Sequence, residues 1–313
     1  MQLHKNRDFS AMFQDTITFI KRHGKHFFKH FFVVNGVFLL ILLVIGYLLM
    51  SLYTEMIFGT MSDPNQSTAM DQYMNENFGV FLFLITLFIV FGLVSGIIAY
   101  AFTPIYLKLY NKYQSNNFGT KEILDTYKKH LDKIFIFLLC SILLGIPMIA
   151  LLALIGFVLL ITIVGSLLIP VLFGTFMLFF TMTLMEYIEG RRGIWECFGY
   201  SWTLMSTKFW AAVGSVGIFY LISYLIQNVI TLIAYFFGLL KMLTGINDGS
   251  LNQQDVGGIF TVVMMVAFFL GFLLSAVLNA IVLLNQGIVY YSLKEEKENV
   301  NTKSVIDQIG SGE

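Results

Sequence analysis

Basic residues alternate with apolar runs along this chain, and that alternation constrains the fold more than any other feature. Every Lys and Arg except Lys241 falls in one of four polar segments, which are residues 1–30, 107–133, 186–208 and the tail from residue 293. Because basic residues are retained on the cytoplasmic side of a membrane, the pattern predicts a polytopic membrane protein with both termini in the cytoplasm.

The apolar runs that separate these segments have the length of membrane spans. A bilayer core about 30 Å thick needs roughly 20 helical residues. The runs cover residues 31–52, 78–106, 209–237 and 258–291, together with a tract over 134–187 that is long enough for two spans. We expect that tract to reverse direction near Gly156 to Gly165. The sequence therefore predicts an all-α fold with six transmembrane helices in a single membrane domain, residues 1–313.

Composition agrees with this class and excludes others. The chain is 57% hydrophobic and 12% charged, whereas a soluble domain is about 25% charged. Its net charge is zero, so no overall field favours nucleic acid. We expect membrane lipids as partners, including anionic headgroups of the cytoplasmic leaflet, possible contacts with other membrane proteins, and residence in a bacterial inner membrane. Cys140 and Cys197 are not expected to form a structural disulfide in that setting.

Three cytoplasmic segments that precede odd-numbered spans share an amphipathic pattern. Apolar residues recur at helical spacing in each, as in Phe9, Phe13 and Ile17, in Leu124, Tyr127 and Leu131, and in Trp195, Phe198 and Trp202. Such a stripe, flanked by basic residues, is typical of a helix at the membrane interface. An interfacial helix followed by a helical hairpin would thus recur over about residues 9–106, 120–187 and 194–292, as three parallel repeats. The alternative is that any basic amphipathic segment beside a span has this pattern.

Residues 189–210 carry the most specific motif of the chain. An acidic-Gly turn is followed by an amphipathic helix with a Ser and an aromatic residue, a Leu, and an aromatic pair that opens the next span. The matching residues are Glu189-Gly190, Ser201-Trp202, Leu204 and Phe209-Trp210. This motif resembles the membrane domain attached to some bacterial glycerophosphodiester phosphodiesterases and the stand-alone six-span proteins related to it. Where that family usually has basic residues around the Ser, this chain has Gly199 and Tyr200.

The resemblance implies a six-span fold and no reaction, because we find no phosphodiesterase catalytic domain in this sequence. Ionisable residues inside a membrane are costly enough to mark function, and none lies in the middle of a predicted span. Glu186 lies at the inner end of the fourth span. It is interpreted either as a boundary carboxylate bonded to a neighbouring helix or to Arg191 or Arg192, or as a functional acid. The candidate interfacial cluster comprises Glu186, Glu189, Arg191, Arg192, Ser201 and Trp202.

Histidines form a second pattern near the first span. His23, His26 and His30 are spaced to share one helical face, which would suit a metal ion. Lys25 and Lys29 oppose a bound cation. We therefore interpret the histidines as part of a basic, membrane-facing collar, and expect no metal and no cofactor.

Carboxamides within the spans are the remaining polar feature. The candidate polar seam comprises Gln227, Asn228, Asn279, Asn285 and Gln286. Side-chain amides in hydrocarbon must find hydrogen-bond partners, so the seam is either glue between spans five and six or a polar cavity that recognises a headgroup or small solute. Gly214-Ser215-Val216-Gly217 is interpreted as small-residue packing.

The polar tail, residues 293–313, begins with Leu293 and the Lys-Glu-Glu-Lys-Glu run of residues 294–298, which is expected to be a solvated helix end. Without a catalytic constellation, the favoured function is a non-enzymatic accessory or scaffold protein for a cell-envelope process. The alternative is a transporter or lipid-handling protein that uses the polar seam, and an enzyme with unrecognised chemistry ranks third.

Overall fold

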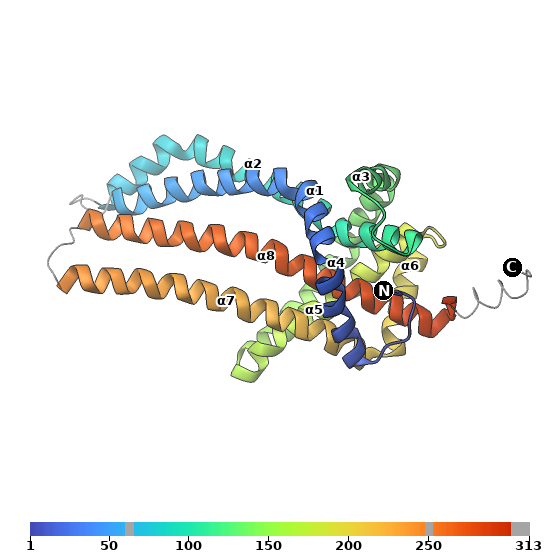
Figure 1. Cartoon of the computed structure of the whole chain (residues 1–313). Helices are drawn as coiled ribbons and strands as arrows, with labels where there is room; N and C mark the ends of the chain where they lie inside the picture. The colour runs from blue at the N-terminus through green and yellow to red at the C-terminus, as the bar shows by residue number, and fades with distance from the viewer. Residues whose placement is uncertain (60–65, 248–252, 302–313) are drawn as a thin grey trace, which may run out of the picture. The chain divides into compact units, whose positions relative to one another are not determined.

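The structure is a computed structural model that describes residues 1–59, 66–247 and 253–301. Within these ranges its regular structure is α-helical (Figure 1). The helices are α1 (Phe9–Gly59), α2 (Gln66–Tyr113), α3 (Thr120–Lys129), α4 (Leu131–Leu160), α5 (Ile163–Glu189), α6 (Ile194–Thr207), α7 (Phe209–Asn247) and α8 (Gln253–Glu298). The end of the predicted polar tail, residues 302–313, lies outside the described residues.

Six of these helices, α1, α2, α4, α5, α7 and α8, are long and apolar enough to cross a membrane. This confirms the prediction of an all-helical chain with six candidate spans, as in a multi-pass membrane protein. The long apolar tract reverses where it was expected, because α4 ends at Leu160 and α5 begins at Ile163. Thr162 caps α5 by accepting a 2.9 Å hydrogen bond from the backbone N–H of Gly165.

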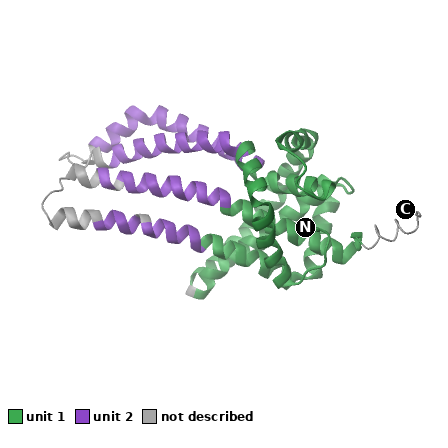
Figure 2. Ribbon diagram, in the orientation of Figure 1, with its two compact units in different colours: residues 1–34, 99–224, 278–313 green, residues 35–98, 225–277 purple. Residues whose placement is uncertain are grey.

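The chain forms two compact units (Figure 2). Unit 2 comprises residues 35–98 and 225–277, which are segments of α1, α2, α7 and α8. Close approach of helices at glycine characterises its packing. The ring of Phe268 on α8 occupies the space that a Cβ at Gly46 of α1 would need, and Val263 of α8 lies against Gly238 of α7 in the same way. Helix contacts of this kind suit a lipid-embedded bundle, where packing rather than water exclusion drives association.

Unit 1 comprises residues 1–34, 99–224 and 278–313, of which the structure describes those up to residue 301. Its core is rich in aromatic rings: Phe27 of α1 lies 5.3 Å from Phe102 and 4.9 Å from Tyr106 of α2, edge to face. Small residues again permit close contact, since Gly217 of α7 packs on Val171 of α5. The interpretation of residues 214–217 as packing is consistent with this contact.

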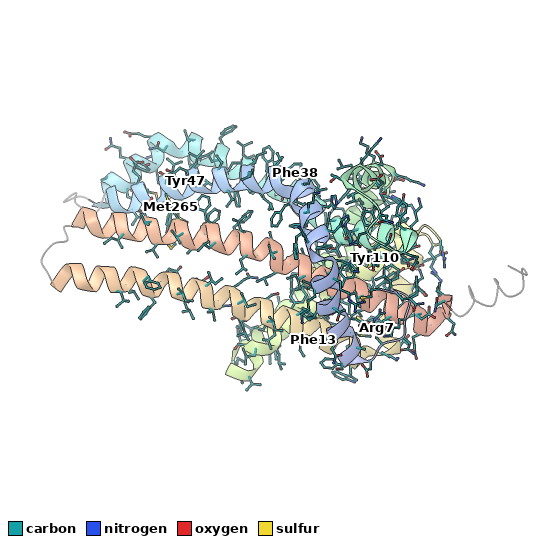
Figure 3. The ribbon with its side chains drawn as sticks, viewed as in Figure 1. Arg7, Phe13, Phe38, Tyr47, Tyr110 and Met265 are labelled. Carbon is teal, nitrogen blue, oxygen red and sulfur yellow. The ribbon has the colours of Figure 1, made fainter. Side chains whose placement is uncertain are left out.

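Arg7, just before α1, organises the segment that precedes that helix (Figure 3). Its guanidinium donates to the carboxylate of Asp15 at 2.7 Å and to the backbone carbonyls of Leu3, Lys5 and Gln2 at 2.7 to 2.9 Å. Its backbone N–H donates to Ser292 Oγ of α8 at 3.0 Å. A buried charge needs such a complete set of partners, so residues 2–7 are held against α8.

The predicted amphipathic segments fold in two ways. The second and third form separate short helices, α3 and α6, whereas the first continues without a break into the apolar run of α1. No proline interrupts residues 9–59. Both α3 and α6 begin after a glycine whose N–H donates to a glutamate three residues later, Gly119 to Glu122 at 2.8 Å and Gly193 to Glu196 at 3.1 Å.

The histidines of α1 contradict the interpretation as a membrane-facing collar. His30 is 6% exposed, and its Nδ1 lies 2.7 Å from Thr120 Oγ1. The Nδ1 of His26 lies 2.8 Å from the hydroxyl of Tyr106, and Nε2 of His23 lies 3.2 Å from that of Tyr110. Imidazole nitrogens and hydroxyl groups satisfy one another here, so these side chains connect α1 to α2 and to the start of α3.

Candidate functional site

The end of α5 positions Glu186, a buried carboxylate of unit 1. Gly190 terminates α5 with φ of +82°, a left-handed conformation that favours glycine. Its N–H reaches the carbonyl of Glu186 at 3.4 Å. The chain therefore turns sharply before α6 begins at Ile194, and this turn returns Arg192 to the carboxylate of Glu186.

Glu186 is fully buried and accepts hydrogen bonds at both carboxylate oxygens. Arg192 Nη1 donates to Oε1 in an ion pair. Oε2 accepts from the hydroxyl of Tyr290 at 2.6 Å and from Lys294 Nζ at 2.7 Å, both from α8. Lys294 also donates to the Tyr290 hydroxyl at 2.9 Å. Charge-assisted bonds of this kind are roughly twice as strong as neutral ones.

A second carboxylate completes the network. Glu298, at the end of α8, accepts from Arg192 Nη2 at 3.2 Å and from the hydroxyl of Tyr200 at 2.5 Å. The Arg192 guanidinium lies 3.7 Å from the ring centroid of Tyr200. Burial and the bond to Glu298 raise the pKa of Tyr200, so its hydroxyl stays a donor. We define Glu186, Arg192, Tyr200, Tyr290, Lys294 and Glu298 as the Glu186 cluster.

The chemistry of this cluster is that of a balanced ionic lock. It contains two carboxylates, one guanidinium and one ammonium. Both carboxylate oxygens of Glu186 accept hydrogen bonds from protein donors. A carboxylate so engaged is poorly placed to accept a proton from a substrate. The adjacent Cys197 is equally unreactive, because burial and the charge of Glu186 raise the pKa of its thiol to about 11.

The role expected of the polar tail is wrong at its start. Lys294 is 2% and Glu295 8% exposed, so the start of the Lys-Glu-Glu-Lys-Glu run is not a solvated helix end. Lys294 lies far from Glu186 in the chain, and no local pattern links them. A usable signal was present in the spacing of Tyr290, Lys294 and Glu298, which places three polar groups four residues apart on one face of α8.

The other residues of the candidate interfacial cluster are dispersed. Arg191 is exposed and lies 3.7 Å from Glu298, at the edge of the Glu186 cluster. Glu189 lines two cavities. Ser201 is buried in α6, whereas Trp202 beside it is exposed. The apolar stripe of α6 is likewise divided, since Phe198 is buried and Trp195 is exposed.

The candidate polar seam is divided between the two units. In unit 1, Asn285 is buried and donates from Nδ2 to Thr16 of α1 at 3.0 Å and to Ser215 of α7 at 3.1 Å. Gln286 is also buried and accepts from Thr181 of α5 at 2.6 Å. Asn279 is exposed. Gln227 and Asn228 belong to unit 2. Asn285 therefore bonds α8 to α7 and α1, and Gln286 bonds α8 to α5.

Comparison of the chain with models of protein families, with curated proteins and with solved structures gave no match.

Proposed function

We propose that this chain is a non-enzymatic, multi-pass protein of a bacterial inner membrane that acts as an accessory or scaffold in a cell-envelope process. Both termini are cytoplasmic in this proposal, which follows from the retention of Lys and Arg on one side. The motif of residues 189–210 resembles the membrane domain attached to glycerophosphodiester phosphodiesterases, and the proposal gives this chain the six-span fold of that domain, with three repeated units of an interfacial helix and a hairpin.

The observation that supports this function best is the mutual pairing of the charged groups in the Glu186 cluster, whose Glu298 also pairs with Arg191 at its edge. Its acids and bases bond to one another and join the end of α5, the start of α6 and the end of α8. Breaking such a buried pair by removing one partner is strongly destabilising. A carboxylate whose two oxygens both accept hydrogen bonds from protein donors suits a rigid platform better than a proton relay, which needs an accessible oxygen.

The candidate polar seam also favours a scaffold over a transporter. Asn285 and Gln286 direct their side chains to Thr16, Ser215 and Thr181. Amides that join helices in this way act as glue. The repeated units are supported by the matching starts of α3 and α6, each a Gly followed by a capping Glu.

Gentle extraction tests the function directly. The full chain, tagged at its C-terminus, is cross-linked in cells, extracted with a mild detergent and analysed by mass spectrometry. A scaffold retains a reproducible set of other envelope proteins, and a six-span protein of unrelated function carrying the same tag controls for carry-over. A chain that purifies alone after cross-linking would contradict the proposal.

The topology has its own test. Alkaline phosphatase fused after Glu313 should be inactive and green fluorescent protein at the same point should fluoresce, because both report the cytoplasm. High phosphatase activity would overturn the proposed orientation.

A further inference from the structure

A second group of charges in unit 1 has the opposite character to the Glu186 cluster. An open cavity of about 290 Å³ lies among the C-terminal end of α2, α3 and the end of α5. It is lined by Lys108, Leu109, Asn111, Lys112, Thr126, Lys129, His130 and Glu189. We define this as the basic cavity. One water occupies about 30 Å³ in the liquid, so the cavity has room for a group much larger than a water.

The lysines of the basic cavity divide by role. Lys108 Nζ donates to the carbonyl of Ile188 at 2.6 Å, and Lys133 Nζ beside the cavity donates to that of Tyr187 at 3.0 Å. Lysines bonded to the last carbonyls of a helix stabilise its C-terminus. These two therefore have a structural role at the end of α5.

Lys112 and Lys129 lie in the last turns of α2 and α3, and neither ammonium group donates to a backbone carbonyl among the described residues. Both are exposed, and neither forms an ion pair with an acid among the described residues. Lys112 only approaches the ring of Tyr113, at 5.2 Å. Glu189 is the one acidic residue among those that line the cavity, against three lysines. The wall therefore carries excess positive charge.

His130 adds a further polar group whose protonation state is fixed by its partners. Its Nδ1 lies 2.8 Å from the carbonyl of Thr126, which can only accept, and its Nε2 lies 3.1 Å from Lys108 Nζ, which donates. A neutral imidazole protonated on Nδ1 fits both contacts. Burial and the positive charge of Lys108 lower the pKa of His130. The ring holds Lys108 in place without adding charge.

The lysines around the cavity repel one another, and a bound anion would attract each of them. Lysine ammonium groups are common ligands of phosphate, and basic pockets between spans on the cytoplasmic side suit lipid phosphate groups. We propose that the basic cavity binds a phosphate group, with Lys112 and Lys129 as its exposed cationic ligands and Lys108 as one held by protein bonds. The favoured source of this phosphate group is the headgroup of an anionic phospholipid, since the residues that line the cavity adjoin two candidate spans, α2 and α4.

This inference rests on the membrane location proposed above, but not on the scaffold role. The full chain in an uncharged detergent is titrated with phosphatidic acid, phosphatidylglycerol, phosphatidylcholine or inorganic phosphate, and bound species are counted by native mass spectrometry. The test variant is Lys112→Ala/Lys129→Ala. The matched control is Lys121→Ala/Lys128→Ala, which removes two exposed lysines from α3 that do not line the cavity.

We expect both anionic lipids to bind the wild type and the control alike, and to bind the test variant about 30-fold more weakly, given about 1 kcal/mol for each lysine. Inorganic phosphate that binds and displaces lipid with the same dependence on Lys112 and Lys129 would also support a phosphate site, with a solute as its source. Equal weakening in both variants would show general surface attraction and overturn the site. Absence of anion binding in the wild type would overturn the site too. It would leave the scaffold role untouched, because co-purification with envelope proteins tests that role separately.

Discussion

The Glu186 cluster and the basic cavity lie in the same compact unit, and both use residues from the end of α5, yet their charges are arranged in opposite ways. In the cluster, two acids and two bases are bonded to one another, and Glu186 and Lys294 are shielded from solvent. In the cavity, three lysines face one glutamate, and two of the lysines are exposed.

Charge balance separates structural groups from groups available to a ligand. A balanced buried network is already satisfied, so an incoming molecule would have to displace protein bonds to enter it. An unbalanced wall gains from an incoming counter-charge. If this comparison is right, substitutions in the cluster change stability and leave anion binding alone, whereas substitutions of the exposed lysines do the reverse.

The largest effect is expected from Glu186→Gln. The change leaves the ammonium of Lys294 buried beside a neutral amide, and removal of one partner of a buried pair costs about 3–5 kcal/mol. Thermal unfolding in detergent measures it, and Cys197 provides a local readout. In a Cys140→Ser background, a maleimide should label Cys197 slowly in the wild type, because its thiol is buried with a pKa near 11, and much faster in the variant.

Glu189→Gln is the matched control, because that carboxylate is three residues further on and only partly buried. Equal unfolding temperatures for Glu186→Gln and the wild type would contradict the assignment of the cluster as a lock.

Replacing both Glu186 and Lys294 tests whether these two charges stabilise each other. Glu186→Met/Lys294→Met removes the acid and the base together, while Arg192 keeps its bond to Glu298. Paired removal of buried charges is often nearly neutral, so the double variant should be more stable than Glu186→Met alone by about 1–3 kcal/mol. A double-mutant cycle with both single variants measures this coupling, and purely additive losses would show that the two charges do not interact.

Sequence reasoning located one side of the cluster and missed the other. Glu186 and Arg192 are six residues apart, within reach across the turn at Gly190, so the sequence alone offers their pairing as one alternative. Lys294 and Glu298 were missed because the polar run that contains them looks solvated unless the partner helix is known. The basic cavity was missed for a related reason. The lysines of the basic cavity indicate which side of the membrane their segment faces, but their positions in the sequence do not show that they lie close together in space.

The helices were easier to predict from the sequence than the Glu186 cluster or the basic cavity. Four apolar runs and one tract long enough for two spans predicted six long helices, and Gly156 and Gly165 bracketed the reversal at Ile161–Thr162. The continuity of α1 could not be read in the same way. An amphipathic stripe and an apolar run differ in composition, but both favour helix, so composition alone cannot reveal whether a break separates them.

Acid should weaken the fold through His130. Its pKa is lowered in the folded protein by burial and by Lys108, so the unfolded chain binds the proton more readily. The stabilisation is complete above the unfolded pKa, about 6.5, and is lost as pH falls below it towards the lowered folded value. Thermal unfolding at about pH 7.5 and about pH 5.5 measures the effect, and His130→Gln should flatten part of the dependence. An identical pH profile in wild type and variant would show that His130 does not contribute.

The smallest change in stability is expected from Lys112→Ala/Lys129→Ala. Both side chains are exposed and lack acidic partners among the described residues, and substitutions of that kind usually stay within about 0.5 kcal/mol. Relief of repulsion with Lys108 and the higher helix propensity of alanine act against the lost interaction of each lysine with the C-terminal end of its helix. Thermal unfolding without added anion should therefore give nearly the same temperature for this variant, its Lys121→Ala/Lys128→Ala control and the wild type.

Adding phosphatidic acid should then stabilise the wild type and the control but not the cavity variant, because a ligand raises the unfolding temperature only of the protein that binds it. A cavity variant that is already unstable without ligand would instead assign Lys112 and Lys129 to the fold, and the contrast between the two charge groups would fail.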